Sequence, residues 1–130
     1  MEDVARLVKS QIGYIPCFVR FPGGSSNNVS AKYTEGIMTD LVQEVQQRGF
    51  QYYDWNGSFG DGAYLDTDAI IENACSYDRY DNVILLCHDS GNKQTTVEAL
   101  PAIIEYYRAK GYSFEAIDRD TLVVHHSVHN

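Results

Sequence analysis

Three side chains of types common in catalytic sites each follow a short apolar or aromatic run: Arg20, Asp54 and His88. A cation, a carboxylate and an imidazole that meet in one hollow have the outline of a hydrolytic site. A neighbouring carboxylate favours the protonated imidazole, which then serves as a general acid near neutral pH. We therefore expect these residues to form a catalytic set. The spacing alone leaves open a structural, hydrogen-bonded His88 and a surface ion pair for Arg20.

Other chemical patterns in the sequence are weaker. Trp55 directly follows Asp54 and would either line a sugar-binding groove or fill a gap beneath its loop. The glycine-rich residues 22–28 lack the spacing of a phosphate-binding loop. His125 and His129 are four residues apart, as metal ligands on a helix are, but no carboxylate is spaced to complete a site, so we expect no metal there.

Helical periodicity alternates with β-rich runs along the chain. We expect helices at 3–13, 37–49, 69–77 and 96–111, and strands at 17–21, 51–55, 82–87, 112–117 and 122–124. This order predicts a parallel α/β sheet, whose loops at the carboxyl ends of the strands carry the chemistry. The loops that hold Arg20, Asp54 and His88 are therefore expected to converge. Because residues 83–87 are all apolar, that strand should be covered on both faces.

Length and composition limit the classes of function. The 130 residues suit one domain, and we expect a single domain over 1–130. With 18 acidic and 10 basic residues, the net charge of -8 would repel a phosphate backbone, which argues against nucleic acid as a partner. We expect no membrane segment, because the longest apolar run, 83–87, is far too short to cross a bilayer. The three cysteines form no CxxC pair, and we expect buried, inert thiols.

Taken in order, three segments resemble conserved motifs of the NodB-type polysaccharide deacetylases, which are carbohydrate esterase family four. CFVRFPGGSSN is similar to the third motif of that family, YYDWNGSFGDGA to the fourth, and VILLCHDSGNKQTTVEALPAIIEYYRAKGYSFEAI to the fifth. The resemblance spans nearly the whole chain. It implies a partial (β/α) barrel of about five strands and four helices, corresponding to the C-terminal portion of a deacetylase catalytic domain.

The resemblance also implies roles for individual residues. His88 would be the general acid, Asp54 would tune His88, and Arg20 would orient the catalytic base. Trp55 and Leu86 would form walls of the pocket that receives the acetyl group. The implied reaction is hydrolysis of N-acetyl groups, which are non-peptide carbon–nitrogen bonds, on peptidoglycan or chitin-type sugars. In the family a divalent metal, zinc by expectation, activates the water.

The sequence also departs from this family. The first motif, TFDDG, and the second, a His-x-x-x-His pair, have no counterpart before Arg20. Asp61-Gly62 is a superficial echo of the first motif, and His125 with His129 has the spacing of the second but follows the fifth. We accept neither as a substitute. The chain is therefore expected to lack the base and the metal ligands and to be inactive alone.

A barrel cut open leaves strand edges with unpaired backbone groups, so we expect association, including homo-oligomers, through such an edge. The family resemblance implies an extracellular or cell-envelope location, and from the start of the sequence we expect no signal peptide in this chain. Two alternative functions stay open. One is a non-catalytic carbohydrate-binding or scaffold module, and the other is a flavodoxin-like binding domain, for which no phosphate loop is present.

Overall fold

The computed structural model describes residues 2–129 and divides into two compact units. The first unit contains the residues up to Asp54 together with those from His125 onward, and the second contains Trp55–Val124. The expectation of a single domain stays a prediction. Met1 and Asn130, which belong to the expected domain range, lie outside the described residues.

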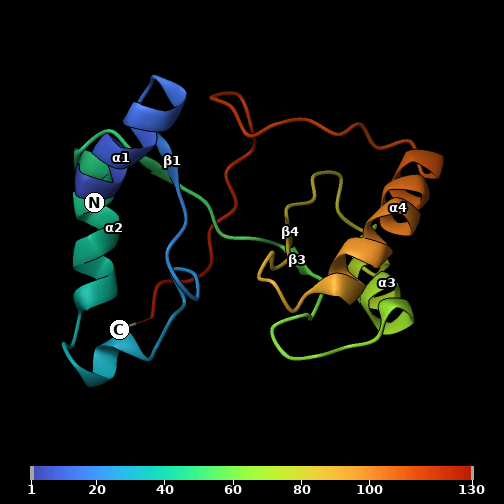
Figure 1. The fold of residues 1–130 in the computed structure, drawn as a ribbon. Coiled ribbons are helices and arrows are strands. Elements are labelled where there is room, and N and C mark those ends of the chain that lie inside the picture. The colour runs from blue at the N-terminus through green and yellow to red at the C-terminus, as the bar shows by residue number, and fades with distance from the viewer. Residues whose placement is uncertain (1, 130) are drawn as a thin grey trace. The chain divides into compact units, whose positions relative to one another are not determined.

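The first unit contains helix α1 (Glu2–Ile12), strand β1 (Phe18–Val19), the 3-10 helix η1 (Ser30–Lys32), helix α2 (Ile37–Gln47) and strand β2 (Gln51–Tyr52) (Figure 1). The strands β1 and β2 pair in parallel, as expected, with Phe18 opposite Gln51. The core is formed by Met38 and Val45 of α2, which pack with Phe21 and Tyr52. The apolar stripe of α2 therefore fixes β2, which ends two residues before Asp54.

The second unit contains strand β3 (Gly57–Ser58), helix α3 (Thr67–Cys75), strand β4 (Leu85–Leu86) and helix α4 (Gln94–Ala109). The helices α3 and α4 pack against each other, and β3 pairs in parallel with β4 (Figure 1). Asp66 caps α3 by accepting a hydrogen bond from the Ala69 N–H at 2.8 Å. The core of the unit consists of Phe59, Ile70, Ala74, Ala99, Ile103 and Tyr107.

The four expected helices are present within a few residues of their predicted ends, but the strands differ from expectation. The strand expected at 51–55 ends at Tyr52, and the chain forms the separate strand β3 at residues that we expected to be loop. The strand β2 pairs with β1, and the next strand, β3, pairs with β4 in a second ladder. Within residues 2–129 the strands form two separate two-stranded ladders, not a closed barrel.

The strands expected at 112–117 and 122–124 do not form. Between them, Asp118 accepts hydrogen bonds from the Asp120 N–H and the Thr121 hydroxyl, both at 2.9 Å, which makes a tight turn. The flanking residues have β-like composition, but a strand also needs a neighbouring strand to pair with. In the described chain these segments have none.

The strand expected at 82–87 is reduced to β4, and it is not buried on both faces. Val83 and Leu85 pack against the α3–α4 core, while successive side chains of an extended segment point to opposite sides. Residues 83–86 are accordingly half-buried, and Cys87 is exposed. The expectation of three buried thiols is therefore wrong: Cys17 and Cys75 are half-buried, and all three cysteines are free thiols.

None of the helices over residues 2–129 combines the length and the apolar character that crossing a bilayer requires.

Candidate active site

His88 lies two residues beyond the end of β4 and forms a hydrogen-bonded pair with Asp61. The imidazole Nδ1 lies 2.8 Å from Asp61 Oδ1, and the His88 backbone N–H donates to Oδ2 at 2.9 Å. An ionised carboxylate only accepts hydrogen bonds, so Nδ1 carries the proton. The His88 side chain is 44% exposed, and Nε2 is the ring nitrogen left for an external molecule.

Asp61 is almost completely buried, with 1% of its surface exposed. Besides the two bonds from His88, its Oδ2 accepts a hydrogen bond from the Thr96 hydroxyl at 2.9 Å. Burial by itself would raise the pKa of Asp61, but the hydrogen bonds from His88 and Thr96 outweigh burial and lower the pKa below its ordinary value. The lowered pKa favours the ionised carboxylate of Asp61, whose position is fixed by three hydrogen-bond donors.

Trp55 and Leu86, the two expected pocket walls, lie in the same unit as His88. Leu86 is opposite Ser58 in the β3–β4 ladder, and its carbonyl accepts a hydrogen bond from the Phe59 N–H at 2.9 Å. Trp55 is half-buried and precedes β3 by two residues. The ladder thus fixes the backbone of Leu86 two residues before His88, and a role in binding an acetyl group stays a prediction for both walls.

Asp54 follows β2 in the first unit and is also buried, with 1% exposure. Its Oδ1 accepts from the Ser25 N–H at 2.8 Å, and its Oδ2 accepts from the Ser25 hydroxyl at 2.5 Å and the His126 N–H at 2.8 Å. Burial favours a raised pKa for Asp54, but the bonds from Ser25 and His126 prevail and lower it. Asp54 therefore ties the loop after β1 to the segment near the end of the chain.

The carboxylate hydrogen-bonded to His88 is that of Asp61, where the expectation named Asp54, whose own role toward His88 stays a prediction. Both oxygens of Asp54 are engaged by Ser25 and His126 within its own unit. By sequence, Asp61 only echoes another motif and was not expected in the site. The sequence did offer a local signal: Asp61 is an acidic residue in a glycine-rich loop, two residues after the aromatic Phe59.

Arg20 follows β1 and is exposed, with Nη1 donating to the Phe21 carbonyl at 3.3 Å. Arg20 and Asp54 belong to the first unit, whereas Trp55, Leu86 and His88 belong to the second. Convergence of the three loops on one rim therefore stays a prediction. The pair that the structure does establish is His88 with Asp61.

The histidines near the end of the chain interact with the first unit. The His125 ring stacks on Tyr52, with ring centroids 3.7 Å apart, and its Nε2 lies 3.0 Å from the Tyr52 carbonyl oxygen. His126 Nδ1 lies 2.9 Å from the Ser26 hydroxyl. Over residues 2–129, no three His, Cys, Asp or Glu side chains gather as a metal ion requires. The residues that the structure describes therefore do not fit a metal centre.

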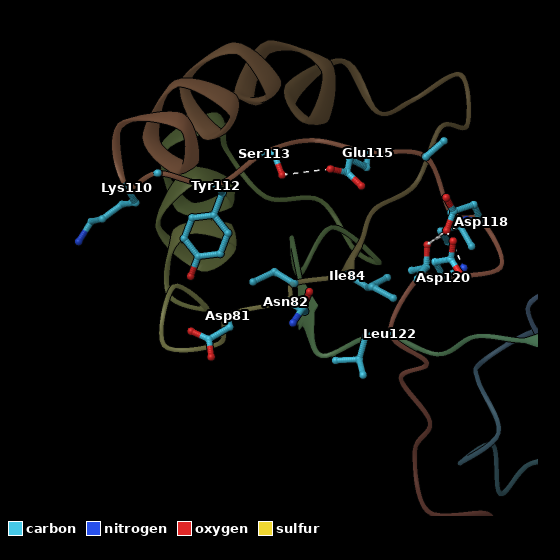
Figure 2. Close-up of a pocket in the computed structure, with 15 residues that line it drawn as sticks. Asp81, Asn82, Ile84, Lys110, Tyr112, Ser113, Glu115, Asp118, Asp120 and Leu122 are labelled. Carbon is cyan, nitrogen blue, oxygen red and sulfur yellow. Dashed lines mark hydrogen bonds between the residues drawn. The ribbon is translucent and has the colours of Figure 1, made fainter.

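A hollow of about 710 Å³ lies elsewhere in the second unit (Figure 2). It is lined by residues 81–84, which precede β4, and by residues 110–113, 115–118 and 120–122. His88 and Asp61, which follow strands β4 and β3, are not among its lining residues. The hollow is thus separate from the His88–Asp61 pair.

Comparison with known proteins identifies a consistent group of relatives in sequence. No family model matches the chain. The chain is 30% identical over 133 residues to YheN of Bacillus subtilis, which is named as a polysaccharide deacetylase, and 28% identical over 127 residues to a peptidoglycan-N-acetylglucosamine deacetylase of Bacillus cereus. These matches cover 97% and 93% of the chain. The chain spans 43% of the length of each of these relatives.

Solved structures give the same result for the fold. The catalytic domain of a peptidoglycan N-acetylglucosamine deacetylase from Eubacterium rectale matches 99% of the chain with a TM-score of 0.93 and 38% identity. The polysaccharide deacetylase Bc1974 from Bacillus cereus matches 96% with a TM-score of 0.77 and 26% identity. The chain covers 59% of each of these two structures. A CE4 esterase from Streptococcus mutans is also similar, with a TM-score of 0.65 and 25% identity.

Proposed function

We propose, on the premise that this chain is homologous to part of the CE4 polysaccharide and peptidoglycan deacetylases, that it forms the general-acid side of a deacetylase active site. The expected reaction is hydrolysis of the N-acetyl group of peptidoglycan or chitin-type sugars. The observation that carries the proposal is the His88–Asp61 pair, in which a buried carboxylate holds a partly exposed imidazole. The similarity to named deacetylases supports the substrate class.

The imidazole of His88 performs the protonation step. When the carbon–nitrogen bond of the substrate breaks, the departing amine nitrogen needs a proton, and the imidazolium supplies it from Nε2. Asp61 keeps the ring oriented through Nδ1 and balances the positive charge of the imidazolium. We expect this proton transfer to contribute about 10²–10⁴-fold to the rate.

The remaining residues support substrate binding and positioning. Trp55 and Leu86 form walls for the acetyl group, and Arg20 orients the catalytic base. We assign the tuning of His88 to Asp61, because Asp54 directs its carboxylate to Ser25 and to the His126 backbone. Asp54 instead holds residue 25 of the loop that begins just after Arg20.

The base and any metal ligands lie, in this proposal, outside the described residues. The chain spans 43% of its curated relatives and 59% of two solved deacetylase structures, and residues 2–129 offer no metal-binding cluster. We expect the described fold to be part of a NodB-type barrel and to show no deacetylase activity alone. Peptidoglycan as substrate would place the protein at the cell envelope.

A chimera tests the proposal directly. The matching 59% of the Eubacterium rectale catalytic domain is replaced by this chain, and acetate release from N-acetylglucosamine oligosaccharides is measured. We expect activity that falls about 10²–10⁴-fold in His88→Ala. His129→Ala is the matched control, because His129 is exposed and bonds to the Ser25 carbonyl through its backbone N–H, which the substitution keeps.

A chimera that binds the oligosaccharide, is folded and releases no acetate would contradict the hydrolytic proposal. That outcome would favour the non-catalytic carbohydrate-binding module instead. Activity that persists in His88→Ala would contradict the role of the general acid.

A further inference from the structure

Lys93 contacts the backbone of the loop that carries Asp61. Its Nζ donates to the carbonyl oxygen of Asp61 and lies 3.4 Å from the carbonyl oxygens of both Gly62 and Ala63. An ammonium group has three donors and no acceptor, so three successive carbonyls match its capacity. Such a contact needs a backbone curved around the ammonium group.

This loop has little other backbone support between its two ends. At one end the Gly60 N–H donates to the Ser58 hydroxyl at 3.0 Å, and at the other Asp66 caps α3. Among the described residues, no backbone N–H donates to the carbonyls of residues 61–63. Lys93 therefore supplies the hydrogen bonds that these carbonyls would otherwise seek from water.

The first turn of α4 holds Asp61 in two ways. Lys93, which directly precedes α4, donates to the Asp61 backbone, and Thr96 donates to the Asp61 carboxylate at 2.9 Å. Lys93 is half-buried, and a hydrogen bond from a charged donor is stronger than a neutral one. The contact with Lys93 fixes the position of the Asp61 backbone, from which the carboxylate reaches His88 Nδ1.

We infer that Lys93 is a positioning residue that fixes the Asp61 loop and thereby sets the tautomer of His88. In this role Lys93 acts through Asp61 and does not itself contact the substrate. Its catalytic meaning rests on the proposed function, but the geometry that it predicts is independent of activity. A side chain of similar length without the ammonium group should free the loop and loosen the Asp61–His88 bond. The His88 ring should then no longer be restricted to the Nδ1–H tautomer.

The test uses the full chain and nitrogen-15 NMR of the histidine side chains at a pH where the rings are neutral. In the unmodified protein we expect His88 as the Nδ1–H tautomer. In Lys93→Met we expect a mixture of tautomers and about tenfold faster solvent exchange of the Nδ1 proton. Lys93→Arg keeps several donors and should restore the Nδ1–H tautomer.

Lys110→Met is the matched control, because Lys110 lies at the other end of α4 and its Nζ pairs with Asp78 at 3.1 Å. His125 in the first unit is an internal reference in every spectrum. We expect Lys110→Met to leave the His88 signals unchanged. The His125 signals should stay the same in every variant.

A folded Lys93→Met protein with unchanged His88 tautomer and exchange would overturn the inference. Methyl signals of the buried Ile70 report folding of the same unit. If these signals collapse in both Lys93→Met and Lys93→Gln, Lys93 maintains the fold as a whole, and the positioning role is also overturned. None of these results depends on acetate release, so failure of the proposed function is detected separately.

Discussion

At the scale of the residue, two buried aspartates take different partners and so acquire different roles. Asp54 accepts from a hydroxyl and from two backbone N–H groups, none of which changes its charge near neutral pH. Asp61 accepts from the imidazole of His88, a ring whose nitrogens can gain and lose a proton. Both carboxylates stabilise local structure, but Asp61 is coupled to a group that can transfer a proton.

The lowered pKa values of Asp54 and Asp61 predict how stability depends on pH. A carboxyl group whose pKa is lowered by folding binds fewer protons in the folded state. Its contribution is therefore present above its unfolded pKa, 3.8 for both aspartates, and is lost as the pH falls through the lower folded values. We expect the free energy of unfolding to decrease below about pH 4.

Urea unfolding at several pH values measures this effect in the second unit, where Trp55, the only tryptophan, reports by fluorescence. Asp61→Asn should lower stability at neutral pH by about 1–3 kcal/mol and flatten the acid dependence. The exposed Asp40 gives the control Asp40→Asn. An Asp61→Asn protein with the original acid dependence would show that this carboxylate does not contribute.

At the scale of the element, the short β3–β4 ladder depends on a glycine. A Cβ added at Gly57 would lie 2.5 Å from Leu85 Cδ2 and 2.8 Å from Tyr77 Cγ. Real Cβ atoms do not approach other atoms so closely, so the ladder or the Tyr77 ring must move. Since Leu85 lies three residues before His88, that movement would also reach the candidate site.

Gly57→Ala should therefore lower the free energy of unfolding by about 1–3 kcal/mol, and thermal melting followed by Trp55 fluorescence measures the loss. Gly62→Ala is the control, because a Cβ at Gly62 meets nothing within 4 Å. Equal melting temperatures for the two variants would contradict the close approach of β3 and β4.

Local pattern predicts helices better than strands in this chain. Ile37, Leu41 and Val45 recur at helical spacing, and α2 begins at Ile37 as expected. Residues 112–117 have β-rich composition, but composition does not reveal whether a pairing neighbour exists. The Asp61–His88 contact was missed for a related reason, since 27 residues separate the two and no local spacing connects them.

At the scale of the whole molecule, several large apolar side chains of the first unit are exposed. Val4 and Leu7 of α1 are each 64% exposed, and β1 has no ladder partner other than β2 among the described residues. Unpaired strand edges and exposed apolar side chains promote association with another chain. The expectation that the chain associates remains a prediction, and these features support it.

Light scattering at micromolar concentration measures the association. We expect a mass above the 14.7 kDa of one chain, and Leu7→Asp should reduce it by placing a charge on the apolar face of α1. Tyr33→Asp is the matched control, because Tyr33 is 86% exposed in the same unit but lies outside α1. A compact monomer for the unmodified chain would contradict the prediction.

The most direct test of the account is a double-mutant cycle on His88 and Asp61 in the chimeric deacetylase, with kcat for acetate release as the measurement. If Asp61 acts through the His88 ring, His88→Ala should lower kcat by about 10²–10⁴-fold, and adding Asp61→Asn should lower it little further. Asp61→Asn alone should lower kcat substantially. Unchanged kcat in Asp61→Asn, or losses that multiply in the double variant, would show that the two residues do not work as a unit.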